Sequence, residues 1–251
     1  MTMPDSAVTT QEIEPGVVRI TMQDRVNKNT FSRELAEGLI DAFAEVGANA
    51  RWRVAILTGY DSYFASGGTK EGLLFLSEGK GRFSDTDFYS LALNCPIPVI
   101  AAMQGHGVGG GFVLGLFADF PILSRESVYT ANFMKYGFTP GMGSTFVLPE
   151  KLGIGLAEEM MITARTYRGE ELHRRGVPFP VLPRAEVMAY ALDLARTVAD
   201  KPRVSLVTLK DHLVAPLRAG LAPVIDRELA MHAATFGQPE VRERIEALFG
   251  N

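Results

Sequence analysis

Two glycine-rich segments, each between a strand-like run and a helix-like run, constrain this 251-residue chain more than any other feature. The first is YFASGGTKEG, Tyr63 to Gly72, and the second is MQGHGVGGGFVLGLFAD, Met103 to Asp119. Glycine suits positions where the backbone approaches another group closely or adopts a positive φ. Both segments are therefore predicted to be tight turns that connect a buried strand to a helix.

Strands and helices are predicted to alternate in the first part of the chain. Apolar and β-branched runs predict strands, and apolar residues at helical spacing predict helices. Strands are expected at residues 17–23, 53–60, 97–104 and 120–127, and helices at 32–49, 71–78 and 110–119. The helix over 32–49 shows the helical spacing in Leu35, Leu39, Phe43 and Val46, with Ser32 as its N-cap.

The C-terminal part of the chain has a different pattern. Helices are predicted over residues 184–200, 203–221, 222–236 and 239–250, with Pro202 and Pro223 as breaks. Alternating strands and helices followed by helices alone indicate an α/β protein. We expect an α/β core over residues 1–182 and a helical C-terminal region over residues 183–251.

Composition and charge exclude several classes of function. A net charge of −4 argues against a nucleic acid or an anionic membrane as partner, because both select a basic surface. The N-terminus lacks a signal-peptide pattern and no apolar run spans a bilayer, so a cytoplasmic location is expected. Cys95 is the one cysteine and is expected to be a packing residue. The sequence shows no cluster with metal-ligand spacing, so no metal is predicted.

Gly105, Gly107 and Gly110 match the spacing of a dinucleotide-binding turn, which is a weak signal by itself. In that fold an acidic residue ends the next strand and binds the ribose, and only Glu126 is near the required place. The motif also lies past residue 100, whereas such a fold usually begins with it. These features disfavour a nucleotide site.

An oxyanion hole is the other chemical use of two glycine-rich turns. If each turn follows a strand and opens a helix, each can direct one backbone N–H at a single carbonyl oxygen. The helix N-termini add positive dipole ends at the same place. From the residues alone, a pair of tight turns with no ligand remains the alternative.

YFASGG, PVIAAMQGHGVGGG and KYGFTPGMGSTFVLPEKLG resemble the crotonase (enoyl-CoA hydratase/isomerase) superfamily, and the resemblance covers nearly the whole chain. It implies a spiral of β-β-α units, a helical C-terminal trimerisation region and acyl-thioester substrates. It also implies that the oxyanion donors are the N–H groups of Gly68 and Gly110. No cofactor is expected.

Two positions depart from the hydratase pattern of that superfamily. A hydratase has one glutamate three residues after the oxyanion glycine, where this chain has Val113, and another before the PGxG turn, where it has Phe133. Neither side chain transfers a proton. Decarboxylation needs no activated water, and an apolar cavity drives a carboxylate toward neutral CO₂. The departures therefore favour decarboxylation.

GYDSYFASGGTKEGLL, SRESVYTANFMKYGFTPGMG and KPRVSLVTLKDHLVAPLR resemble the decarboxylating enzymes of polyketide β-branching cassettes more closely. The resemblance implies that a histidine of the C-terminal helix and a lysine of the loop after the oxyanion helix act on the substrate. The histidine is His232. The lysine is predicted to be Lys80, with Arg82 as the second candidate and Lys70 as the third. From the residues alone, a packed histidine and solvated cations remain open.

The resemblance implies conversion of 3-methylglutaconyl-acyl carrier protein to 3-methylcrotonyl-acyl carrier protein or its β,γ isomer. An acidic carrier protein is the expected partner, and Leu172–Val177 and the pair Lys201 and Arg203 are candidate docking sites. A homotrimer or a dimer of trimers is expected. Two alternatives stay open: a crotonase-fold isomerase or hydratase acting on a CoA ester, and a non-catalytic trimeric scaffold that binds carrier proteins.

Overall fold

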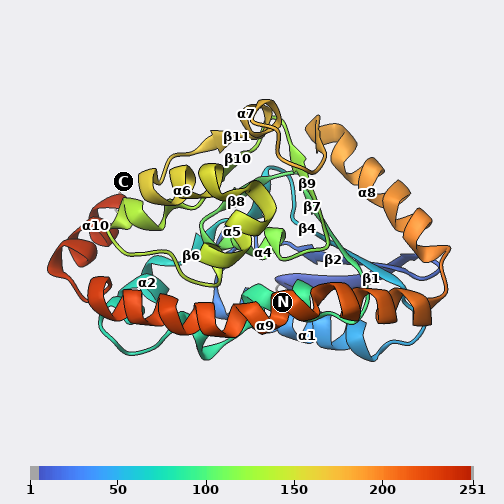
Figure 1. Ribbon diagram of the computed structural model, residues 1–251, viewed down its shortest axis with the longest axis horizontal. Coiled ribbons are helices and arrows are strands. Elements are labelled where there is room, and N and C mark those ends of the chain that lie inside the picture. The colour runs from blue at the N-terminus through green and yellow to red at the C-terminus, as the bar shows by residue number, and fades with distance from the viewer. Residues whose placement is uncertain (1–5, 250–251) are drawn as a thin grey trace, which may run out of the picture.

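A computed structural model describes residues 6–249 and shows two main sheets surrounded by helices (Figure 1). The large sheet has the order β1 (Val8–Glu14), β2 (Val17–Met22), β4 (Val54–Thr58), β7 (Val99–Met103), β9 (Phe120–Ser124) and β12 (Val181–Leu182). The second sheet contains β11 (Tyr167–Arg168), β10 (Val128–Thr130), β8 (His106–Val108) and β5 (Tyr63–Ala65), and β3 (Thr30–Phe31) pairs with β6 (Gly67–Gly68). Apart from the β1–β2 hairpin, the large sheet is parallel.

The helices are α1 (Arg33–Ala48), α2 (Lys70–Ser77), α3 (Leu91–Asn94), α4 (Gly110–Leu116), α5 (Ser144–Leu152), α6 (Ile154–Thr163), α7 (Gly169–Arg174), α8 (Arg184–Ala199), α9 (Arg203–Thr235) and α10 (Pro239–Phe249). There are also three short 3₁₀ helices within the described residues: η1 (Phe83–Asp85), η2 (Phe88–Ser90) and η3 (Asn132–Tyr136). Within the described residues, no helix is both long and apolar enough to cross a membrane.

Three strand–strand–helix units follow one another along the chain. Each begins with a strand of the large sheet, continues with a strand of the second sheet and ends in a helix: β4–β5–α2, β7–β8–α4 and β9–β10–η3. This arrangement confirms the predicted α/β fold and its spiral of β-β-α units. The glycine run leads into α4 at Gly110, as predicted, whereas the short strand β8 between β7 and α4 was not predicted.

The sheet is covered on both faces, which explains why its strands read as unbroken apolar runs. In β4, Ala55 and Leu57 belong to the main core, whereas Ile56 packs in a second cluster with Ala191 and Ala195 of α8. On the main-core side, α1 buries the four predicted apolar residues, and the Leu35 N–H donates to Ser32 Oγ over 3.2 Å. The predicted helix and its cap are confirmed.

Helix α9 is continuous over 33 residues, so the predicted break at Pro223 was wrong. An interior proline costs a helix about 3 kcal/mol, which packing along its length has to offset. Leu221 and Val224 on either side of Pro223 are buried. Nearer the start of α9, the buried Lys210 ammonium donates to the Ala92 carbonyl and lies 2.8 Å from Asp119 Oδ2. These contacts hold α9 across the molecule.

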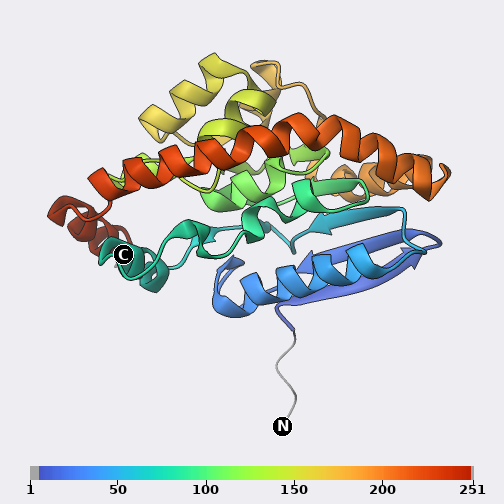
Figure 2. The same ribbon diagram turned by 60° about the horizontal axis from the view of Figure 1, so that its bottom comes forward.

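Figures 1 and 2 show α9 crossing the molecule from the end of α8 to α10 and α2. The long helix therefore carries its C-terminal residues to the far end of the structure. Helix α8 follows residue 182 and packs on the large sheet against β4, β7 and β9, so it belongs to the same core as the strands. The division of the chain at residue 182 therefore stays a prediction.

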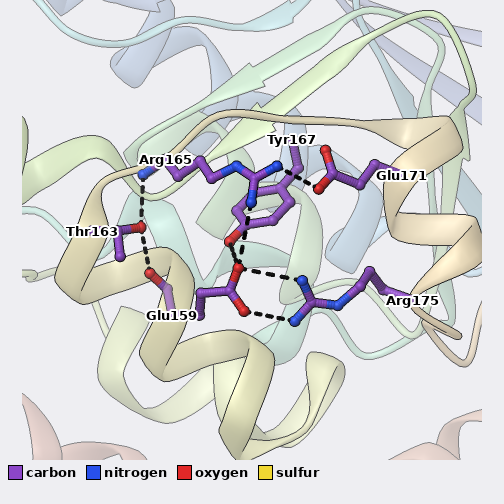
Figure 3. Close-up of polar contacts among 6 residues, drawn as sticks. All are labelled: Glu159, Thr163, Arg165, Tyr167, Glu171 and Arg175. Carbon is purple, nitrogen blue, oxygen red and sulfur yellow. Dashed lines mark hydrogen bonds and ion pairs between the residues drawn. The ribbon is translucent and has the colours of Figure 1, made fainter.

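A polar cluster joins α6 to β11 and α7 (Figure 3). The hydroxyl of the buried Tyr167 donates to Glu159 Oε1 over 2.7 Å, and Arg175 Nη2 donates to Glu159 Oε2 over 2.7 Å. The hydrogen bonds from Arg175 and Tyr167 lower the pKa of Glu159 from its ordinary 4.5 to about 2. Glu159 is therefore ionised across the physiological range.

Replacing Glu159 with glutamine is expected to lower the Tm more at about pH 7 than at about pH 3, because a carboxylate with a lowered pKa stabilises the fold above its ordinary pKa and loses that effect as the pH falls. Calorimetry at both pH values measures the difference. The matched control is Glu158→Gln, an exposed neighbour on α6. An equal Tm loss at both pH values would contradict the lowered pKa.

Candidate active site

A cavity of about 310 Å³ lies at the end of the molecule where α9 meets α2 and α10. Its walls come from the β6–α2 and β8–α4 turns, the loop after α2, η3, the turn before α5, and the last residues of α9 and α10. Phenylalanine is the most frequent lining residue, with eight of them: Phe31, Phe75, Phe83, Phe88, Phe133, Phe138, Phe236 and Phe249. The cavity therefore suits an apolar acyl chain.

Both predicted oxyanion glycines, Gly68 and Gly110, line this cavity. The turns before them need glycine, since φ is +78° at Gly67 and +54° at Gly109. A Cβ on Gly67 would lie 2.8 Å from the Val108 carbonyl and 3.7 Å from the Gly110 nitrogen, so the two turns touch. Gly110 is the first residue of α4, where a backbone N–H has no partner inside the helix.

Asn29 fixes the segment that leads to the first turn. Its buried side chain donates to the carbonyls of Met22 and Phe64, over 3.0 and 2.9 Å, and its backbone carbonyl accepts from the Ser66 N–H. These bonds tie β2, β5 and the residue before Gly67 together. Asn29 was not predicted from the sequence, because its partners lie up to 37 positions away along the chain.

His232 lines the cavity from α9 and is partly buried. Its Nε2 lies 2.8 Å from the Thr139 carbonyl oxygen. Since a carbonyl only accepts, Nε2 carries the hydrogen and Nδ1 is the lone-pair nitrogen of the neutral ring. Phe83 and Phe236 lie edge-on or tilted to it, each with ring centroids 5.0 Å away. Burial lowers the pKa of His232, although the carbonyls of Thr139 and Pro140 act in the opposite direction.

The loop after α2 places its two cations differently. Arg82 lines the cavity and pairs with Asp85, whose Oδ1 lies 3.2 Å from Arg82 Nε. The Lys80 side chain is 61% exposed, and its ammonium lies 2.7 Å from Glu78 Oε2. Lys80 is outside the set of described residues that line the cavity. Lys70, the first residue of α2, is also outside this set. The structure thus brings Arg82 to His232, Gly68 and Gly110.

The two positions that carry glutamates in hydratases are apolar, as the sequence indicated. Phe133 lines the cavity, whereas Val113 is fully buried in the core below it. Asp85 was not predicted from the sequence, and it is the one carboxylate among the described lining residues. A hydrogen bond from the Arg82 backbone N–H is the main cause that lowers the pKa of Asp85. Asp85 is therefore ionised and is a poor proton donor.

The other expectations have clear positions in the structure. Cys95 is buried in the core, and burial raises the pKa of its thiol. Among residues 6–249, no group of three or more His, Cys, Asp or Glu side chains is arranged to hold a metal ion. Of the candidate docking residues, Arg203 begins α9, so at ~1.5 Å per residue it lies about 43 Å from His232. That distance separates it from the cavity of its own chain.

The model of the enoyl-CoA hydratase/isomerase family matches residues 12–249. The chain is 62% identical to the bacillaene synthase decarboxylase PksI of Bacillus subtilis, over 99% of this chain and 100% of that protein. It superimposes with a TM-score of 0.96 on a structure from a dehydratase/decarboxylase enzyme couple involved in polyketide β-branching, at 62% identity over 98% and 97% of the two chains.

A second solved structure is similar over its whole length. The ECH2 decarboxylase domain of CurF from Lyngbya majuscula has a TM-score of 0.93 and 48% identity, covering 98% of this chain and 100% of that one. Together with the strand–strand–helix spiral and the paired glycine turns, these matches confirm the resemblance seen in the sequence. The chain belongs to the enoyl-CoA hydratase/isomerase family.

Proposed function

We propose that this protein is a decarboxylase of polyketide β-branching that converts 3-methylglutaconyl-acyl carrier protein to 3-methylcrotonyl-acyl carrier protein or its β,γ isomer. The observation that carries the proposal is the cavity itself. Two predicted oxyanion glycines and a histidine surround an apolar space, and Phe133 occupies the position where a hydratase has a glutamate. The similar proteins named as decarboxylases support the same reaction.

The reaction breaks the bond between the distal carboxylate and the adjacent carbon. The electron pair passes through the double bond to the thioester, and CO₂ leaves. The resulting dienolate oxygen lies between the N–H groups of Gly68 and Gly110, each of which contributes about 3 kcal/mol to transition-state stabilisation. His232 and Lys80 hold the carboxylate out of the plane of the conjugated enoyl thioester, so that the breaking bond overlaps the double bond. One of them then delivers the proton that completes the product.

Hydration is the reaction that the cavity supports least. Water addition needs a proton-transferring group next to the enoyl double bond. Asp85 is the one carboxylate of the described lining, and its carboxyl group is engaged by the Arg82 backbone N–H over 2.8 Å. Decarboxylation instead uses the apolar wall, which solvates an anion poorly.

Intact-mass measurement of the acyl-phosphopantetheine arm tests the proposal. The protein is incubated with 3-methylglutaconyl-acyl carrier protein, and loss of the mass of CO₂ is the expected result. A gain of the mass of water would overturn it in favour of a hydratase. Tight carrier-protein binding without any mass change would overturn it in favour of a scaffold. The corresponding CoA ester, assayed in parallel, shows whether the carrier protein is required.

Separate replacement of Lys80 and Arg82 by alanine identifies the loop cation. Arginine does not release a proton in proteins, whereas lysine both attracts a carboxylate and transfers a proton. Gly79 and Gly81 flank Lys80, and an exposed ion pair such as Lys80–Glu78 is weak, so the ammonium has the freedom to reach the substrate.

Lys80→Ala is expected to lower kcat about 10- to 100-fold, whereas Arg82→Ala is expected to act mainly on KM. Steady-state rates of CO₂ release measure both effects. Arg51→Ala, which removes an exposed cation that follows α1, is the matched control with unchanged rates. If Arg82→Ala loses kcat and Lys80→Ala does not, Arg82 is the cation.

The carrier protein and the oligomer are parts of the same proposal. The substrate arm enters the cavity at the end of α9, and an acidic carrier protein docks at the mouth.

Two exposed leucines one turn apart on α9, Leu209 and Leu213 (57% and 62% exposed), fit a contact between subunits of a trimer. Leu213→Glu is expected to shift the mass in solution toward the monomer, as measured by light scattering. An unchanged trimer would place the interface elsewhere.

A further inference from the structure

Glu228 is a buried carboxylate that the proposed mechanism does not use. It lies on α9 one turn before His232 and has no solvent exposure. Its Oε2 accepts from the Gly143 N–H over 2.7 Å, and its Oε1 accepts from the N–H and the hydroxyl of Thr145 over 2.8 and 2.6 Å. No ion pair to Glu228 is formed within residues 6–249. Burial raises its pKa, and these hydrogen bonds oppose the rise.

The partners of Glu228 belong to the turn that His232 also contacts. Glu228, His232 and Thr235 lie on one face of α9. His232 bonds to the Thr139 carbonyl, and the hydroxyls of Thr235 and Thr139 lie 3.0 Å apart. The turn over residues 139–145 is thus bonded to α9 at three successive positions. Glu228 makes more of these attachments than His232 or Thr235, because its carboxyl group accepts three hydrogen bonds from the turn.

This turn forms part of the cavity wall through Gly141 and Met142. A Cβ on Gly141 would lie 2.9 Å from the His232 ring, so the turn sets how far the ring enters. Met142, with φ of +62°, reaches the oxyanion glycine, since a Cβ on Gly110 would lie 2.6 Å from Met142 Sδ. A non-glycine residue at such a φ persists only where its surroundings hold it. Glu228 accepts from the residue directly after it.

Glu228 caps α5 from a distant part of the chain. Helices α1 and α2 are capped by their own Ser32 and Thr69. At the start of α5 a serine is also present, but the buried Ser144 hydroxyl has no hydrogen-bond partner within the described residues. The cap comes instead from the helix that carries His232, more than 80 positions along the chain.

We propose that Glu228 is a positioning residue for the decarboxylation: by holding the 139–145 turn, it fixes His232 in the cavity and Met142 against Gly110. The inference rests on the proposed function. Glu228 touches no substrate and acts only through this turn, so its removal displaces two groups of the site at once.

Glu228→Gln tests the inference with the whole protein. The glutamine amide presents a donor to either the Gly143 or the Thr145 N–H, which leaves two donors facing each other. We expect kcat to fall about 10- to 100-fold, because a displacement of about 1 Å at a catalytic group has that effect, while KM changes less than about threefold. Thr145→Val, which removes one of the three bonds, is expected to show a smaller loss, and Thr145→Ser is expected to restore the rate.

Lys210→Met is the matched control, since it removes another buried charge of α9 at a distance from the cavity. It is expected to lower the Tm without changing kcat. The NMR signal of the His232 Nε2 proton provides a second readout: hydrogen bonding to Thr139 protects it in the wild type and in Lys210→Met, and the protection is lost in Glu228→Gln.

The outcomes separate the two proposals. If the wild type releases no CO₂, the proposed function fails, and the Nε2 proton still reports on the position of His232. If the wild type is active and Glu228→Gln keeps both its kcat and the protected proton, the positioning role is overturned. The same conclusion holds if Glu228→Gln loses activity only in proportion to its unfolded fraction. Should Glu228→Gln fail to fold, Thr145→Val and Thr145→Ser decide the question by the same two readouts.

Discussion

Replacement of His232 with alanine is expected to lower kcat for CO₂ release about 10²- to 10⁴-fold, the range of a lost proton-transfer group. In the resting structure Nε2 donates to the Thr139 carbonyl, so a proton that His232 delivers to the dienolate comes from Nδ1. Burial lowers the pKa of His232, and an anionic substrate beside the ring raises it again. The carboxylate thereby helps to load the proton that replaces it.

Single-turnover mass measurements on 3-methylglutaconyl-acyl carrier protein check this expectation. His212→Ala is the matched control, because His212 is exposed on the same helix, and its rate should equal that of the wild type. His232→Gln separates two functions of the ring, since glutamine keeps a hydrogen-bond donor but supplies no exchangeable acid. Full activity in His232→Ala would assign the proton to another group and leave Lys80 as the sole candidate.

Local sequence patterns predicted those elements whose determinants are close along the chain. Helix α1 is an example, because its cap at Ser32 directly precedes the 16-residue helix that carries the apolar stripe. Pro223 shows the opposite case. Its local signal is a helix break, yet α9 runs through it, since the buried neighbours Leu221 and Val224 and the anchor at Lys210 pack against distant parts of the chain.

The same distinction applies to the site. Gly68, Gly110 and His232 could be assigned by resemblance, and the structure places all three around one cavity. The loop cation was harder to predict, because Lys80 and Arg82 are two residues apart and their directions depend on Glu78 and Asp85. Glu228 and Asn29 carry no local signal that points to the site, since the turns that they hold lie far away in the sequence. Long-range polar contacts are the part that needed the structure.

Gly110→Ala is expected to lower kcat about 10²- to 10³-fold, the loss that accompanies one displaced oxyanion donor. A Cβ at this position would lie 2.6 Å from Met142 Sδ and 2.7 Å from Phe31 Cε2, closer than non-bonded carbon contacts allow. Met142 Sδ ends a flexible side chain, but the Phe31 ring cannot retreat freely, because it packs edge-on against Phe88 with ring centroids 4.7 Å apart. The first turn of α4 therefore shifts, and its N–H leaves the position that the thioester oxygen needs.

Gly155→Ala is the matched control, because a methyl group on Gly155 in α6 would meet no neighbouring group within 4 Å, and alanine favours a helix. Steady-state rates of CO₂ release and thermal melting curves are compared for both variants. A Gly110→Ala protein that melts normally but has lost kcat with little change in KM assigns the loss to the transition state. Unchanged kcat would remove Gly110 from the oxyanion hole. Because the backbone N–H survives in alanine, such a loss measures the position of the donor, which is the quantity that the two glycine turns and the 139–145 turn together control.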